Sequence, residues 1–230
     1  MTGRELKKYR KDCRLTQEQT AQVLGLSQTY LSLLEKNKRP LTTRLKQKVV
    51  RKLQVRPTEL PANAKSYKVS KVSDDQLTAD LAALGYKGFS HWKASQPKNP
   101  ADVLLSALHT DKRDARLVEA LPWVVLHFSD MEWKSLVRAA KVYDLQNRLG
   151  FVTNVARRVA EFRNDRETVD KLTRVESELE HSRLEREDTL CNETMTRSER
   201  NWLQVQRSEA AKQWHLLTDL SPRNLNYYAG

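Results

Sequence analysis

The side chains with the most suggestive chemistry lie on one face of a short helix that the sequence predicts from Gln28 onward. At about 100° per residue, that face carries Gln28, Thr29, Ser32, Leu33 and Lys36. The amide of Gln28 can hydrogen-bond N6 and N7 of adenine together, while methyl groups of Thr29 and Leu33 can contact the methyl group of thymine. These residue types at this spacing indicate a helix that reads base edges in the major groove of DNA.

A basic run follows this helix directly. Lys36, Asn37, Lys38 and Arg39 come after it, and Gln17 begins the helix before it. We expect these side chains to contact phosphates and to fix the register of the protein on DNA. The complete set of candidate DNA-contacting residues is Gln17, Ser27, Gln28, Thr29, Tyr30, Ser32, Leu33, Lys36, Asn37, Lys38 and Arg39. Tyr30 belongs to this set although the helical wheel places it on the packing side.

Two helices and a tight turn must position that face. Thr16 and Gln19 form a Thr-x-x-Gln capping box that starts the first helix. Gly25 suits the left-handed residue that ends this helix, and Ser27 caps the next one. The stretch from residue 16 to residue 40 therefore predicts a helix-turn-helix.

An ordinary helical hairpin with a polar outer face would give the same pattern, and the distribution of charge argues against it. The formal net charge is +12. Residues 1–60 hold 15 Lys and Arg against 5 Asp and Glu, a net charge of +10, and the other 170 residues hold 26 against 24, a net charge of +2. A basic module joined to a nearly neutral remainder is typical of nucleic-acid-binding proteins.

Residues 4–60 resemble the Xre/Cro-type family of phage-repressor-like DNA-binding domains, which fold as a compact bundle of five helices. The resemblance places the following residues in the core: Leu6, Leu15, Ala21, Leu24, Leu26, Leu31, Leu34, Leu45, Val49 and Leu53. It also implies a structural ion pair between Arg10 and Glu35, with Glu35 closing the helix that reads DNA.

The chain departs from this family pattern at three positions. Thr20 stands where the family prefers a large aliphatic residue. Asn37 and Gln54 replace residues that are often glycine. We therefore expect adjusted helix packing at Thr20 and adjusted turn geometry at Asn37 and Gln54.

Composition predicts an all-α protein. The chain has 230 residues, 39% of them apolar, with 6 Gly and 7 Pro. So few helix breakers, together with abundant Leu, Ala, Glu, Arg, Lys and Gln, favour long helices. We expect an N-terminal five-helix helix-turn-helix domain (1–60), a linker (61–73), a helical dimerisation or sensing domain (74–163), and a charged helix followed by an amphipathic helix and a tail (164–230).

Local signals within residues 74–163 predict where helices begin and end. A helix is expected from about Lys112 to Leu121, where Pro122 must break or kink it. Ser129 and Glu132 form a second candidate capping box.

Two segments of this region, RLVEALPWVVLHF and EWKSLVRAAKVYDLQNRLGFV, resemble part of the Xre-type regulators that are encoded beside nucleotidyltransferase-type toxins. The resemblance implies an antitoxin-like role and a toxin-like protein partner.

Residues 164–200 change in character. They carry 7 Lys and Arg against 11 Asp and Glu, a net charge of −4, and few large apolar residues. Leu172, Val175 and Leu179 keep coiled-coil spacing for little more than one heptad. This pattern predicts a solvated helix with a short dimer contact, or a lone exposed helix.

A last amphipathic helix is predicted from about Ser198 to Leu217. It carries Trp202 and Trp214 and needs a surface to cover it. That surface can belong to its own domain, to a second copy of the chain or to a partner protein. The aromatic tail with Tyr227 and Tyr228 is expected to be ordered only where it docks.

The residue types that support catalysis or metal binding are dispersed. His91, His109, His127, His181 and His215 stand singly, Cys13 and Cys191 lie far apart, and no GxSxG, Walker A, GxGxxG or HExxH motif occurs. We therefore expect no catalytic residues, no cofactor and no metal. No apolar run approaches membrane-spanning length and the charged N-terminus lacks the apolar core of a secretory signal, so a cytoplasmic location is expected.

Together these patterns predict a sequence-specific DNA-binding transcription regulator, a repressor that binds double-stranded DNA as a homodimer at a near-palindromic operator. One narrower version is an antitoxin-like autoregulator with a toxin-like partner. Another is a ligand-responsive regulator whose helical domain holds a small molecule in a pocket. An interaction protein whose basic domain binds nucleic acid nonspecifically is the alternative from a different class.

Overall fold

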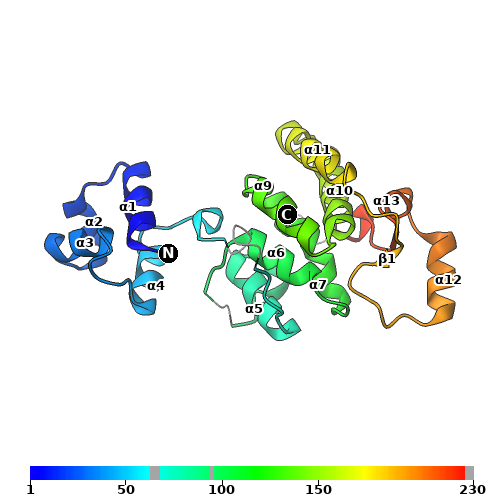
Figure 1. Ribbon diagram of the computed structural model, residues 1–230, viewed down its shortest axis with the longest axis horizontal. Helices are drawn as coiled ribbons and strands as arrows, with labels where there is room; N and C mark the ends of the chain where they lie inside the picture. Colours follow the sequence, from blue (N-terminus) through cyan, green and yellow to red (C-terminus); the bar gives the residue numbers. More distant parts are fainter. Residues whose placement is uncertain (63–67, 94–95, 226–230) are drawn as a thin grey trace. The chain divides into compact units, whose positions relative to one another are not determined.

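The structure, a computed structural model, describes residues 1–62, 68–93 and 96–225. The chain divides into two compact units, Met1–Pro61 and Ala62–Gly230. Helices make up most of both units, and the described residues contain only two short strands, both in the second unit (Figure 1). The all-α class predicted from composition is confirmed.

The first unit consists of short helices, and a side-chain cap starts each of its four α-helices. Its elements are α1 (Gly3–Asp12), α2 (Gln17–Leu24), α3 (Gln28–Glu35), α4 (Thr43–Lys52) and the 3-10 helix η1 (Pro57–Glu59). The hydroxyls of Thr2, Thr16, Ser27 and Thr42 each accept a hydrogen bond from the backbone amide three residues later. The fifth helix expected for this unit is a single 3-10 turn.

One core joins these helices. Seven of the ten expected core residues are buried: Leu6, Ala21, Leu24, Leu31, Leu34, Leu45 and Val49. Leu26 and Leu53 are partly buried against them, and Leu15 is half-buried. Leu41, Val55 and Leu60 complete the core.

Two of the departures from the family pattern occupy left-handed backbone. Asn37 follows α3 with φ of 55°, and Gln54 follows α4 with φ of 51°. Glycine adopts this conformation without a steric penalty, and asparagine tolerates it better than other residues with a side chain. The unit therefore keeps left-handed turns after both helices although neither turn has a glycine.

The second unit is a larger helical assembly. Its elements are α5 (Asp74–Leu84), η3 (Lys87–Phe89), α6 (Pro100–Leu108), α7 (Ala115–Glu119), α8 (Leu121–His127), α9 (Trp133–Val142), α10 (Gln146–Phe162), α11 (Arg166–Glu180), β1 (Asp188–Thr189), α12 (Arg197–Gln206), α13 (Glu209–Gln213), β2 (Leu216–Leu217) and η4 (Pro222–Leu225). Strands β1 and β2 pair in parallel. Val69 and Val72, within the predicted linker, pack against the core of this unit, and residues 63–67 lie outside the described part of the chain.

Helix α10 is the central element of this unit. Most of its residues are buried, and it packs against α8 and α11. Gly150 lies under the ring of Trp214, since a Cβ added there would lie 2.3 Å from two ring carbons. A glycine at this helical position is therefore required for the tryptophan to lie against the helix backbone.

The starts of two helices, α7 and α9, differ from those that the sequence predicts. The helix expected from Lys112 begins at Ala115 because the Asp114 carboxylate accepts a hydrogen bond from the Arg116 amide and caps it there. The interruption expected at Pro122 is present, since α7 ends at Glu119 and the separate helix α8 begins at Leu121 with Pro122 in its first turn, where proline is tolerated.

The Ser129–Glu132 capping box is also absent. Helix α9 starts without a side-chain cap, and the indole of Trp133 donates instead to the carbonyl of Ser129 at 2.9 Å.

The prediction of a solvated α11 with a dimer contact is wrong. Leu172, Val175 and Leu179 are buried in the core of their own unit. Glu176 on the same helix accepts hydrogen bonds from Asn154 Nδ2 at 2.5 Å and from Arg157 Nε at 2.7 Å, both on α10. The three residues do form one apolar stripe, as their spacing predicts, but α10 of the same unit covers it.

The helix predicted from Ser198 to Leu217 is interrupted. Arg207 adopts an extended conformation after α12, and Ser208 caps the separate helix α13. Trp214 is completely buried, whereas the side chain of Trp202 is 57% exposed. The two tryptophans therefore do not share one amphipathic face, and the predicted tail residues Tyr227 and Tyr228 lie outside the described residues.

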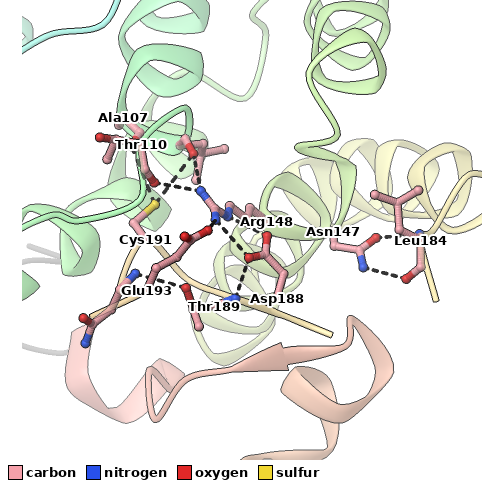
Figure 2. A network of polar contacts seen from close by, with 11 residues as sticks. Ala107, Thr110, Asn147, Arg148, Leu184, Asp188, Thr189, Cys191 and Glu193 are labelled. Atoms are coloured by element: carbon pink, nitrogen blue, oxygen red, sulfur yellow. Dashed lines mark hydrogen bonds and ion pairs between the residues drawn. The ribbon is translucent and has the colours of Figure 1, made fainter. Parts of the chain in front are cut away.

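A polar network fastens the segment after α11 to α10 (Figure 2). Arg148 Nε and Nη2 donate to the two carboxylate oxygens of Asp188 at 2.8 and 2.9 Å, and Nη1 donates to the carbonyls of Leu108 and Thr110 at 2.9 and 2.8 Å. The neighbouring Asn147 forms two hydrogen bonds with the backbone of Leu184, each 2.8 Å long. Burial opposes the charge of Arg148, but the hydrogen bonds to Asp188 and the nearby Cys191 and Glu193 together outweigh this and raise the pKa of the guanidinium.

Candidate nucleic-acid interface

Helix α3 divides into a buried side and an accessible side. Leu31, Leu34 and Glu35 are buried, while Gln28 and Thr29 are exposed. Ser32 and Leu33 have intermediate exposure. Among the residues that the structure describes, the side chains of Gln28 and Thr29 form no hydrogen bond. Their donors and acceptors are available to an external partner.

Tyr30 lies at the border between these two sides. The helical wheel placed it with the packing residues, but its side chain is 36% exposed. Its position in the first turn of α3, where the helix has little covering structure, accounts for this exposure. Tyr30 is therefore accessible at the same helix end as Gln28.

The turn before α3 fixes the direction of the helix. Gly25 has φ of 58°, a left-handed conformation that is strained for residues with a side chain. Its amide donates to the carbonyls of Ala21 and Gln22 at the end of α2. The Leu26 amide donates to the carbonyl of Ala21 at 2.8 Å, and Ser27 Oγ accepts from the Tyr30 amide at 3.2 Å. With its backbone groups occupied in this way, the turn holds α2 and α3 as one unit.

An ion pair lies beneath the end of α3. Arg10 Nε and Nη2 donate to the two oxygens of Glu35 at 2.6 and 3.1 Å, and Arg10 Nη1 donates to the carbonyl of Leu15 at 2.9 Å. Arg10 is 8% exposed and Glu35 is 2% exposed. The structure thus brings together the two residues that the family resemblance pairs, and they join α1 to α3.

In the folded protein the pKa of Arg10 is raised and the pKa of Glu35 is lowered. The hydrogen bond from Arg10 to Glu35 raises the pKa of Arg10. For Glu35, burial alone opposes ionisation, but hydrogen bonds from Arg10 and Gln17 together outweigh it and lower the pKa of the carboxyl. Both groups are therefore charged over the whole neutral range.

Gln17, one of the expected phosphate contacts, forms a hydrogen bond inside the domain. Its Nε2 donates to Glu35 Oε2 at 2.8 Å, and the side chain is half-buried. The amide nitrogen is consequently occupied inside the domain. Gln17 adds α2 to the ion pair, so that one carboxylate is bonded from both preceding helices.

Asn37 also has a structural position. Its Oδ1 accepts a hydrogen bond from the Gly3 amide at 3.0 Å, which joins the start of α1 to the end of α3. A Cβ at Gly3 would lie 1.7 Å from the carbonyl oxygen of Leu34, so the two helices approach closely only because residue 3 is glycine. In the sequence, this contact is indicated by Asn37 itself, which stands where the family pattern often has glycine.

The basic residues that flank Asn37 are accessible. Lys36, Lys38 and Arg39 are exposed, and their side chains form no hydrogen bond or ion pair with any residue in the described ranges. Three free cations thus follow the accessible side of α3. Such groups can neutralise phosphates on both sides of a groove.

Thr20 is a polar residue that the sequence marked without giving it a role. Its side chain is fully buried, and its hydroxyl has no hydrogen-bond partner within the described structure. The large aliphatic residue usual at this position would have no such group. The buried hydroxyl of Thr20 therefore lowers the stability of this unit.

No metal site or membrane span is apparent in the described ranges. Nowhere within them do three His, Cys, Asp or Glu side chains come together where they could hold a metal ion. None of the described helices combines the length and the apolar character needed to cross a bilayer.

Comparison with known proteins identifies the N-terminal unit. Residues 6–60 match a family of helix-turn-helix domains. Searches of curated proteins and of solved structures gave no match. The match covers α2, α3 and the turn between them, and it supports an Xre-like domain in a DNA-binding transcription regulator.

Proposed function

We propose that this chain is a sequence-specific repressor that places α3 in the major groove of its operator. The observation that carries this proposal is the free polar side of α3, on a helix held by the buried Arg10–Glu35 pair. A rigid support matters because base readout requires side chains to be held within a fraction of an ångström of their partners.

The roles of the side chains follow from their positions. Gln28 bonds adenine, and Thr29 and Leu33 contact thymine methyl groups. Lys36 and Arg39, with Lys38, bind phosphates and set register. Gln17 and Asn37 move from the set of DNA contacts to the set of supporting residues, because their polar atoms bond Glu35 and Gly3.

Selection of binding sites from random duplexes, followed by competition with scrambled DNA, tests this function directly. Gln28→Ala should weaken binding to the selected site by about 1 to 3 kcal/mol and leave binding to scrambled DNA nearly unchanged. Gln47→Ala, at an exposed glutamine of α4, is the matched control and should change neither. Equal losses on both duplexes would favour nonspecific binding by a basic domain.

The oligomeric form is part of the same proposal. A homodimer would meet two half-sites about 34 Å apart on one face of a near-palindromic operator. Since the α11 stripe is buried, the exposed Trp202 and Val205 of α12 are the better candidates for a contact between copies or with a toxin-like partner. Sedimentation of the full chain with and without operator, and with the product of a neighbouring gene, distinguishes these arrangements.

We propose that the second unit binds a partner and does not catalyse a reaction. We also propose that the protein acts in the cytoplasm, where it meets its DNA. A ligand-responsive regulator is the second candidate. The observation in its favour is an open cleft of about 460 Å3 in the second unit, lined by residues of α5, η3 and α7.

A further inference from the structure

The cleft has the size of a site for a small organic molecule. Its volume is about 460 Å3, within the range of natural ligand pockets. Its lining comes from three places in the chain: the first turn of α5, the segment from Tyr86 to Trp92, and the segment from Asp114 to Glu119. All the residues that line the cleft belong to the second unit.

One wall of the cleft is aromatic. Tyr86 and Phe89 both line it, with ring centroids 5.3 Å apart and ring planes inclined by 59°. Trp123 meets Tyr86 edge-on at 5.1 Å, which holds the tyrosine ring in place. Trp92 also lines the cleft and is 43% exposed. Aromatic faces carry partial negative charge and attract cations.

The polar lining is predominantly acidic. It contains four carboxylates, on Asp74, Asp75, Asp114 and Glu119, one guanidinium, on Arg116, and the imidazole of His91, which is counted as neutral. Asp74 is neutralised by Arg113, whose Nη1 lies 2.7 Å from it. Three carboxylates against one guanidinium then leave a net charge of −2.

Two of these carboxylates have no protein partner. Asp75 and Glu119 form no hydrogen bond or ion pair with any residue that the structure describes. Asp114 differs, because it caps α7 through the Arg116 amide. Asp75 and Glu119 are therefore the acceptors that a ligand would find unoccupied.

From this combination we infer that the cleft binds a small organic cation, a protonated amine or guanidinium compound with an apolar body. The aromatic wall contacts the apolar body and the face of the cation, and the carboxylates of Asp75 and Glu119 accept its N–H groups. An anion of similar size meets the net negative charge and is excluded. The site concerns the ligand-responsive candidate, but its binding is measured without DNA, so it stands or fails separately from operator recognition.

Calorimetric titration of the full chain with agmatine and with spermidine tests the site, at fixed ionic strength and with glutarate as the anionic comparison. We expect saturable binding of at least one cation and none of glutarate. The double variant Asp75→Asn/Glu119→Gln should weaken cation binding about tenfold or more, because both charged acceptors are lost. Phe89→Leu, which keeps apolar volume but removes the ring, should weaken it several-fold.

The matched control is Asp170→Asn/Glu185→Gln, which removes the same two charges from exposed positions of the second unit outside the cleft. It should bind the cation as the unchanged chain does. Absence of saturable heat with both cations up to about 10 mM would overturn the inference. Equal weakening in the control, or tighter binding of glutarate, would overturn it as well. Thermal unfolding of each variant verifies that it folds before titration.

Discussion

Arg10 in the first unit and Arg148 in the second are both buried, and each binds both oxygens of a carboxylate. The two pairs differ in what they hold. Arg10 joins neighbouring short helices beneath the accessible side of α3, whereas Arg148 joins α10 to a segment 40 residues further along the chain (Figure 2). The same kind of ion pair therefore joins two neighbouring helices in one unit and two distant parts of the chain in the other.

The surroundings of the two pairs differ as well. Arg148 also donates to two backbone carbonyls, so that removing it leaves several buried acceptors at once. Arg10 donates to one backbone carbonyl, and its carboxylate partner keeps a second donor in Gln17. Loss of the arginine should therefore be costlier in the second unit, and loss of the carboxylate should affect function in the first.

The largest effect is expected for Arg148→Met. It should lower the free energy of unfolding of the second unit by about 3 to 5 kcal/mol, because it leaves the Asp188 carboxylate without its cation and removes the guanidinium donor from the carbonyls of Leu108 and Thr110. All five tryptophans lie in the second unit, so tryptophan fluorescence during denaturation reports on that unit alone. Arg138→Met, at an exposed arginine of α9, is the control. A loss equal to that of the control would mean that the network does not support the fold.

Glu35→Ala should have the next largest effect, about 3 kcal/mol on the first unit, because it leaves the guanidinium of Arg10 buried without its carboxylate. DNA affinity should fall with it, since α3 loses its tie to α1. Hydrogen exchange of the α3 amides in the full chain measures the stability of this unit separately. Glu18→Ala, at an exposed glutamate of α2 without a side-chain partner among the described residues, is the control. Unchanged exchange in Glu35→Ala would show that the pair is dispensable.

Acid should weaken the first unit through the same carboxylate. The pKa of Glu35 lies below its ordinary value of 4.5 in the folded state, so the unfolded chain binds more protons between the two values. The contribution of Glu35 is therefore complete above pH 4.5 and is lost as the pH falls through the folded pKa. Exchange of the α3 amides, corrected for intrinsic rates, should show stability that falls as the pH drops below 4.5. Glu35→Gln should lack this component, and an identical pH slope in both proteins would contradict the assignment.

The smallest expected effect is a gain. Thr20→Val keeps the shape of the side chain and removes a buried hydroxyl that has no partner in the described structure. It should stabilise the first unit by about 1 kcal/mol. The same exchange measurement applies, with Thr29→Val as a comparison for the substitution itself, because Thr29 is exposed and its side chain forms no hydrogen bond among the described residues. A destabilised Thr20→Val would reveal a hydrogen bond to this hydroxyl, mediated by water.

The DNA-facing unit could be predicted closely because its signals are local. The caps at Thr16 and Ser27 and the left-handed Gly25 lie within a few residues of the helices they delimit, and they set both helix starts as expected. The basic run after α3 is equally evident from the sequence. What sequence did not indicate is that Gln17 and Asn37 also form hydrogen bonds within the unit, since bonds to Glu35 and Gly3 depend on how three helices meet.

The second unit depended much more on tertiary structure. The periodicity of Leu172, Val175 and Leu179 defined an apolar stripe, but periodicity does not state which surface covers it, and α10 of the same unit does so. The sequence predicts one helix that carries both Trp202 and Trp214. In the structure Arg207 interrupts this helix, so that Trp202 is exposed and Trp214 is buried.

By itself, the sequence determined the helical class, the helix-turn-helix and its basic charge, because propensity, capping and net charge are properties of short segments. Only the tertiary structure decided the Arg148–Asp188 tie, the seat of Trp214 on Gly150 and the acidic aromatic cleft. Each of these brings together residues separated by tens of positions. Their energies come from desolvation and close packing, which exist only once the chain has folded.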